Sequence, residues 1–156
     1  MPFGGDLRAL TDRLHAHASS ADVTAAADKA MADINGAIAT IDQARRRTPS
    51  FVVAVAAGLL KAAQEDYESS LTGGKVTSPI EYEDSWAFFG EARDLIGKAG
   101  AYLAAKDSAA LADLNDQIED LARLWPTMQP PQQIFADASY IGPILGRIES
   151  LRQRFE

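Results

Sequence analysis

The fold is decided by the stretch Gln64-Glu-Asp-Tyr-Glu-Ser-Ser-Leu-Thr-Gly-Gly-Lys-Val-Thr-Ser-Pro-Ile-Glu-Tyr-Glu-Asp-Ser-Trp-Ala-Phe-Phe89. It contains the end of one helix, a glycine turn and the start of another helix, because paired glycines supply the left-handed conformation in which helices end. Pro79 stands at the first position of the second helix, where its missing N–H costs nothing. Ser78 and Glu81 have the spacing of a capping box. The stretch therefore predicts two antiparallel helices joined by a tight turn.

Outward from this hairpin, apolar residues recur at helical spacing along most of the chain. Thr48 and Pro49 predict the cap and first position of the helix that leads into the hairpin. A final segment, 134–156, contains Gly142-Pro143, so we expect it to break or kink there before its later apolar residues rejoin the core. The predicted helices are a short one from Asp6 to about Ser19, then 20–47, 48–71, 78–105 and a fifth that Asp107 or Ser108 caps and that ends at Trp125.

The helix after the turn shows the clearest core pattern. Tyr82, Phe89, Ile96 and Leu103 repeat every seven residues. We expect these residues to point into the core, flanked by a wide apolar face of Phe88, Leu95 and Tyr102. The fold class predicted is all-α: an antiparallel up-and-down four-helix bundle without strands, with an additional short N-terminal helix packed across one end. At 156 residues, the chain is predicted to form a single domain over residues 1–156.

Composition excludes several classes of function. The formal charge of -7 disfavours nucleic acid as a partner, because that affinity depends on clustered Lys and Arg. The longest apolar run, 51–60, is far shorter than the about 20 residues of a membrane span, so no membrane insertion is expected. The first residues lack the basic and apolar regions of a signal peptide. No catalytic motif with a nucleophile or histidine partner is present, and we predict that the protein is not an enzyme.

An acidic and aromatic cluster is expected at the closed end of the hairpin. Asp66 and Glu81 each continue an apolar line of their own helix at a spacing of seven residues. Antiparallel pairing brings Asp66 to the level of Asp84, with Tyr67, Glu81 and Tyr82 within a helical turn. Anionic oxygens of this kind replace the water ligands of hard or borderline cations. These five residues are therefore the candidate metal ligands.

The same residues have a purely structural interpretation. Glu81 is accounted for by the capping box, and acidic residues are favoured in the first turn of any helix. Tyrosines at the edge of a core often donate a hydrogen bond to a neighbouring carboxylate. From the residues alone, a cation site and a capped, hydrogen-bonded helix turn both remain open.

A known family shows a similar pattern. The residues that carry the resemblance are Asp66-Tyr67, Gly73-Gly74-Lys75-Val76, Glu81-Tyr82-Glu83-Asp84 and Phe88-Phe89. This series resembles the extracytoplasmic helical domain that accompanies bacterial iron permeases, in which an Asp-Tyr near a helix end is followed by a Gly-Lys turn and a Glu-Tyr pair. The match covers about 30 residues well and the rest as helical spacing.

The resemblance implies a periplasmic bundle linked to the uptake of iron or another divalent cation, with a membrane permease or other protein as partner. The chain lacks the Arg-Glu-x-x-Glu motifs of the full permease and the Cys-x-x-Cys-His of an attached cytochrome. Transport by this chain alone is therefore excluded. The residues do not identify the cation. The alternatives are a cytoplasmic location and a non-catalytic structural or protein-interaction bundle without a metal site.

Overall fold

The computed structural model describes residues 4–40 and 48–156, and its backbone contacts divide the chain into two compact units, residues 1–46 and 47–156. Each unit is described by itself below. The single domain expected over residues 1–156 stays a prediction.

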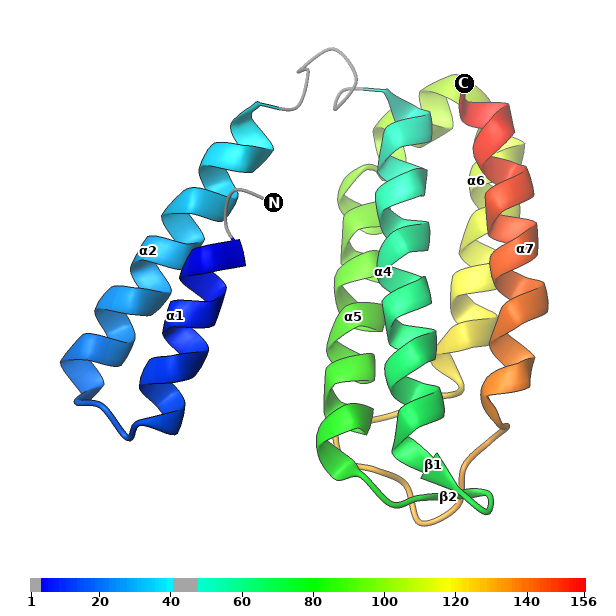
Figure 1. The fold of residues 1–156 in the computed structure, drawn as a ribbon. Helices are drawn as coiled ribbons and strands as arrows, with labels where there is room; N and C mark the ends of the chain where they lie inside the picture. The colour runs from blue at the N-terminus through cyan, green and yellow to red at the C-terminus, as the bar shows by residue number, and fades with distance from the viewer. Residues whose placement is uncertain (1–3, 41–47) are drawn as a thin grey trace. The chain divides into compact units, whose positions relative to one another are not determined.

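The larger unit is a bundle of four helices, in which neighbouring helices run up and down (Figure 1). This arrangement confirms the predicted fold class. In chain order the unit consists of α4 (Pro49–Ser70), β1 (Leu71–Thr72), β2 (Lys75–Val76), α5 (Pro79–Lys98), α6 (Gly100–Ala122), the 3₁₀ turn η1 (Ala138–Tyr140), α7 (Ile141–Arg152) and the 3₁₀ turn η2 (Gln153–Phe155).

The smaller unit is a hairpin of two helices, α1 (Gly4–His15) and α2 (Ser20–Ala39). The helix beginning at Ser20 was predicted to be one of the four bundle helices. That assignment is wrong, because α2 packs against α1 in the smaller unit and α7 supplies the fourth bundle helix. The placement of the first helix across one end of the bundle stays a prediction. The predicted end of this helix at Arg47 lies outside the described residues.

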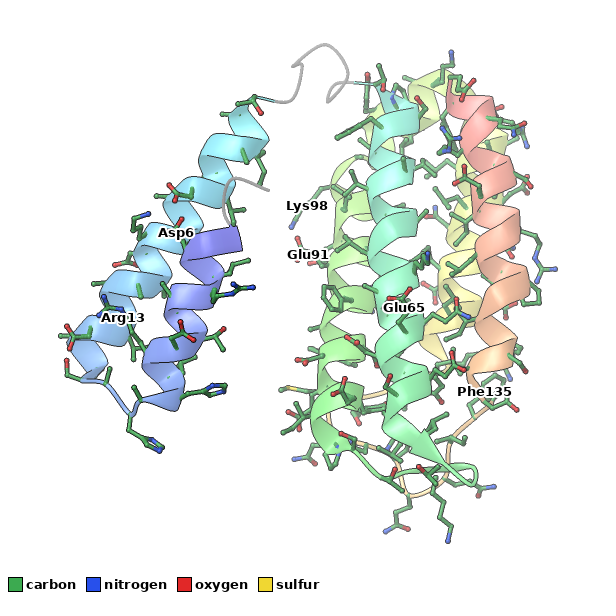
Figure 2. All side chains as sticks on the ribbon, viewed as in Figure 1. Asp6, Arg13, Glu65, Glu91, Lys98 and Phe135 are labelled. Atoms are coloured by element: carbon green, nitrogen blue, oxygen red, sulfur yellow. The ribbon has the colours of Figure 1, made fainter. Side chains whose placement is uncertain are left out.

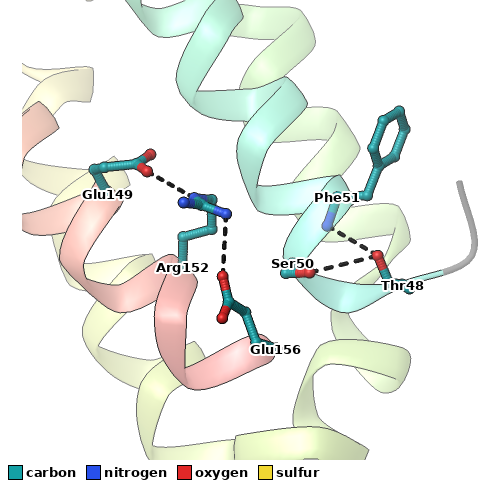
Figure 3. A network of polar contacts seen from close by, with 6 residues as sticks. All are labelled: Thr48, Ser50, Phe51, Glu149, Arg152 and Glu156. Atoms are coloured by element: carbon teal, nitrogen blue, oxygen red, sulfur yellow. Dashed lines mark hydrogen bonds and ion pairs between the residues drawn. The ribbon is translucent and has the colours of Figure 1, made fainter. Parts of the chain in front are cut away.

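The start of α4 follows the sequence prediction. The Thr48 hydroxyl accepts a hydrogen bond from the backbone N–H of Phe51 at 3.3 Å, and Pro49 occupies the first helical position. The end of α7 packs beside this helix, and there Arg152 donates to Glu149 at 2.7 Å and pairs with Glu156 at 3.4 Å (Figure 3). The Thr48 cap at the start of α4 gives the Phe51 N–H a partner that the helix itself does not provide.

The turn between α4 and α5 is tighter than expected. Thr72 pairs with Lys75 across a two-residue loop, and Gly73 and Gly74 both have positive φ, at 58° and 76°. Positive φ at both central residues is the requirement of a type I′ turn, which matches the twist of a β-hairpin. The prediction of a bundle without strands is therefore wrong at β1 and β2, where the glycines allow the backbone to pair instead of fraying.

The capping box predicted at the start of α5 does not form. Pro79 stands in the first turn as predicted, but the Ser78 side chain makes no capping hydrogen bond. Instead, the backbone N–H groups of Thr77 and Ser78 both donate to the carbonyl of Ser70, at 2.8 and 3.2 Å. The chain enters α5 held against the end of α4, which leaves Glu81 without its capping role.

The helix predicted over 78–105 is broken at Ala99, where φ and ψ are -89° and 0°. Gly97 and Gly100 flank this residue, and glycine is the weakest helix former after proline. The next helix, α6, has an extended residue inside it at Asp107, with φ -157° and ψ 99°. The Asp107 carboxylate accepts from the N–H of Ala110 at 2.9 Å, so its predicted role as a cap is confirmed.

The core line predicted on this part of the chain is confirmed, and its flanks are confirmed only in part. Tyr82, Phe89, Ile96 and Leu103 are all buried. Phe88 and Tyr102 are 37% and 46% exposed, so they do not belong to the core. Leu95, the third flanking residue, is partly buried against the core, so the apolar face is narrower than expected but includes part of its predicted flank.

Gly142 and Pro143 do not break the last helix. They lie in the first turn of α7, where proline is tolerated because its missing N–H has no partner inside the helix. Ile144 and Ile148 then point into the core as predicted, with Leu145 and Leu151 partly buried against it.

Replacing Gly74 with valine tests the turn. A β-branched residue at positive φ should lower the free energy of unfolding by about 1 kcal/mol or more. Urea unfolding monitored by circular dichroism measures the change. Gly58→Ala is the matched control, because Gly58 lies exposed inside α4 with nothing within 4 Å of an added Cβ. The control should be neutral or slightly stabilising, and an unchanged Gly74→Val protein would contradict the assigned turn.

Phe89→Ala should destabilise the bundle by about 3 to 5 kcal/mol, because it removes a buried aromatic ring and leaves a cavity. The neighbouring Phe88→Ala is the control, since its ring is 37% exposed. Chemical unfolding of both variants should give a much larger loss for Phe89. Equal losses would overturn the register of α5.

Candidate functional site

The closed end of the α4–α5 hairpin gathers the predicted acidic residues. Leu71 pairs with Val76 and Thr72 with Lys75, so the turn is centred between Gly73 and Gly74 instead of near Lys75. The height of Asp66 relative to Asp84 stays a prediction.

Asp66 is the carboxylate most affected by its surroundings. Its side chain is partly buried, and burial is the largest cause that raises its pKa above the ordinary value. The negative charges of Glu81, Asp84 and Glu65 raise the pKa further, in that order. Glu81 and Asp84 therefore lie close enough to Asp66 for their charges to repel its carboxylate.

Little positive charge offsets this repulsion. Within residues 4–40 and 48–156, none of Asp66, Glu81 and Asp84 forms an ion pair. Glu65 has a cationic neighbour, because Lys61 lies 3.9 Å away one turn earlier on α4. Figure 2 shows Glu65 on the outer side of α4. The hairpin end thus carries a cluster of carboxylates without a matching cation from the described chain.

Tyr67 and Tyr82 are fully buried, with ring centroids 6.2 Å apart. The Tyr67 hydroxyl donates to the carbonyl of Ala136 at 2.8 Å. The Tyr82 hydroxyl lies 3.3 Å from the carbonyl of Leu124 and 3.2 Å from that of Thr127. Both hydroxyls therefore hold the loop that joins α6 to η1, and the predicted hydrogen-bond network with the carboxylates does not form in the described chain.

The ionisation of the two phenols follows from this burial. Loss of contact with water raises the pKa of Tyr67 and of Tyr82 to about 12. Both side chains are neutral near pH 7, and a neutral phenol that already donates to a carbonyl is a poor ligand for a cation. Carboxylates are the better candidates at this site.

Trp125 joins the tyrosines to the core, and sequence reasoning missed its role. Its ring stacks on Phe89 with centroids 4.9 Å apart and meets Tyr67 edge-on at 5.4 Å. Its Nε1 donates to the hydroxyl of Ser85 at 2.7 Å. The signal available in the sequence was a tryptophan directly before a proline-rich turn, but the spacing could not show which side chains it would meet.

The predicted ligand set is thus brought together in part. Glu81 and Asp84 repel the carboxylate of Asp66, whereas the hydroxyls of Tyr67 and Tyr82 are bonded to backbone carbonyls. In the part of the chain that the structure describes, no three His, Asp or Glu side chains are arranged as a ready-made metal cage. The shared cation site stays a prediction.

Comparison with known families gives one match. The family described as "Iron permease-associated 4-helix bundle domain" matches residues 42–155, which include the whole of α4 to α7. No curated protein and no solved structure matches the chain significantly. No helix of residues 4–40 or 48–156 has the length and apolar character needed to cross a membrane.

Asp66→Asn should stabilise the protein near pH 7. The folded-state pKa of Asp66 lies above 3.8, the ordinary value of an aspartate, so the folded protein binds more protons than the unfolded chain between these two pKa values. The wild-type free energy of unfolding therefore falls as pH rises through that window. The amide has no charge to repel its neighbours and should remove this loss.

Urea unfolding of wild type and Asp66→Asn between pH 3 and 7 measures the difference. The gain in the variant should be full above the folded pKa of Asp66 and should shrink as pH falls below it. Asp94→Asn on the exposed side of α5 is the control and should not reproduce the gain. A variant less stable than wild type at pH 7 would show that Asp66 makes a favourable contact instead.

Proposed function

Since this chain belongs to the family of iron permease-associated four-helix bundle domains, we propose that it is a non-catalytic accessory domain that binds a cation for an iron permease. The cation is iron or another divalent metal ion, and it is the cargo of the uptake system. The closed end of the α4–α5 hairpin is the place of binding. The proposed location is the periplasm, where an accessory bundle can meet the cation before the permease does.

The observation that carries this proposal is the unneutralised carboxylate cluster. Asp66 is partly buried and repelled by Glu81 and Asp84, and the described chain supplies no cation to any of the three. Carboxylates that repel one another at a protein surface gain free energy when a cation neutralises them. A divalent ion offers this neutralisation together with a preference for oxygen ligands.

In this proposal the carboxylates and the tyrosines have different roles. Asp66, Glu81 and Asp84 would provide the anionic oxygens, while Tyr67 and Tyr82 fix the helix ends behind them through their hydrogen bonds to the α6–η1 loop. Because no ready-made cage is present in the described chain, a bound ion would keep several of its water ligands. Such an ion is held loosely and can be passed on, which suits delivery to a permease.

A second function is favoured by the apolar residues that stay outside the core. Ile80 is 70% exposed, Phe88 37% and Tyr102 46%. If these side chains form one continuous patch with a partner, that patch would be a protein-interaction surface. The alternative is therefore a bundle that docks on the permease or another protein and has no metal site of its own, in the periplasm or the cytoplasm.

Isothermal titration calorimetry separates the two functions. Protein stripped of metal is titrated with ferrous ion, ferric citrate, and cupric, zinc and calcium ions. The cation proposal expects saturable heat with at least one ion and loss of that heat in Asp66→Asn, because the amide keeps the shape of the side chain and loses its charge.

Asp94→Asn is the matched control, since it removes one exposed carboxylate from the same hairpin away from the cluster, and it should titrate like wild type. Circular dichroism of each protein verifies that the helices are intact. The absence of saturable heat with every ion would reject the cation function and leave the interaction bundle. Equal heat in wild type and Asp66→Asn would place the binding elsewhere.

A further inference from the structure

A groove between α6 and α7 lies apart from the acidic end of the α4–α5 hairpin. The two helices pack against each other within the larger unit (Figure 1), and η2 follows directly after α7. The groove has a volume of about 400 Å³, which falls in the lower part of the range of roughly 300 to 1,000 Å³ that is usual for small-molecule sites. The lining of this α6–α7 groove includes Asp113, Asp116, Gln117, Arg147, Leu151 and Arg154.

Two charged residues of the α6–α7 groove already have partners. The Arg154 guanidinium donates to the Asp113 carboxylate at 3.1 Å and, through two nitrogens, to Asp107 at 3.0 Å. The Asp107 carboxylate also accepts from the backbone N–H of Ala110, so the arginine is fixed to a helix cap. Arg154 and Asp113 are therefore satisfied without any ligand.

Two other charged residues of the groove lack such partners. Arg147 on α7 and Asp116 on α6 are both exposed, and neither forms an ion pair with another described residue. A guanidinium is a fork of donors that matches a carboxylate, and a carboxylate accepts hydrogen bonds from an ammonium group. The groove therefore presents an unpaired cation and an unpaired anion from two facing helices.

Gln117, the neighbour of Asp116 on α6, adds an unsatisfied acceptor. Its Oε1 atom is buried and has no hydrogen-bond donor within the part of the chain that the structure describes. Buried polar atoms nearly always have a partner, so this exception in the lining of a groove indicates a missing donor. The amide can turn about the last bond of the side chain, whose preference is broad, and a donor in the groove can then reach the oxygen.

We propose that the α6–α7 groove binds a small zwitterion with the chemistry of a free, neutral α-amino acid. Arg147 donates to the ligand carboxylate, and the ligand ammonium group donates to Gln117 Oε1 and to Asp116. The two arginines and two aspartates of the lining cancel in charge, which favours a ligand without net charge over an anion or a cation. Leu151 is partly buried and gives the ligand side chain an apolar contact.

The test is a titration of the full chain with glycine, L-alanine, L-leucine and L-glutamine, followed by nitrogen–proton correlation NMR. At least one of them should shift the side-chain amide signals of Gln117 in a saturable manner, together with backbone signals of α6 and α7. Isocaproate, which is L-leucine without its amine, and isoamylamine, which is L-leucine without its carboxylate, should not. These two compounds separate recognition of a zwitterion from apolar contact or attraction to a single charge.

Two variants each remove one contact and keep a side chain of similar size. Arg147→Gln and Gln117→Leu should each weaken the affinity for the amino acid by about tenfold or more, as expected for the loss of a hydrogen bond to a charged group. Arg93→Gln is the matched control, because Arg93 is an exposed arginine on α5 outside the lining of the groove. It should bind the amino acid like wild type.

Circular dichroism and urea unfolding verify that each variant is folded. Gln117→Leu should be at least as stable as wild type, because it removes a buried oxygen that lacks a partner. The absence of saturable shifts with all four amino acids would overturn the proposal. So would equal affinity in wild type and Arg147→Gln, or binding of isocaproate or isoamylamine as tight as that of the amino acid. Asp66→Asn should bind the amino acid like wild type, since this site is independent of the proposed cation function.

Discussion

The left-handed turn at Gly73 and Gly74 is the constraint on which the rest of the bundle depends. Two consecutive residues with positive φ allow a two-residue loop, and that loop fixes the pairing of β1 with β2, from which α4 and α5 run side by side. The register places the two tyrosines near each other and the carboxylates of both helices at one end. A longer loop would centre the turn elsewhere and separate these groups.

The aromatic cluster connects the α4–α5 hairpin to the second half of the bundle. Tyr67 and Tyr82 come from opposite sides of the turn, and Trp125 lies in the loop just after α6, yet all three rings pack together with Phe89. The tyrosine hydroxyls then fix the loop that carries the chain from α6 to α7. Buried aromatic rings supply both a large apolar area and a polar tip, which explains why they stand at the junction of core and loop.

The acidic end of the hairpin and the aromatic cluster are two layers of the same site. The buried layer is satisfied, since each hydroxyl has a carbonyl partner. The outer layer keeps the charge of Asp66 and its neighbours without a counterion in the described chain. The proposed cation site depends on this contrast between hydroxyls that have hydrogen-bond partners and carboxylates that have no ion-pair partner among the described residues.

The sequence by itself determined the local features of this protein. Helical spacing, the Thr48 cap, the Asp107 cap and the core line from Tyr82 to Leu103 could be predicted because each depends on residues close along the chain. The resemblance to iron permease-associated bundles was also readable from the hairpin. Only the tertiary structure decided which helices are partners, because spacing shows that a face is apolar but not which neighbour covers it. For the same reason α2 was assigned to the wrong unit, and the tyrosine hydroxyls were expected to meet carboxylates when backbone carbonyls of a distant loop lie closer.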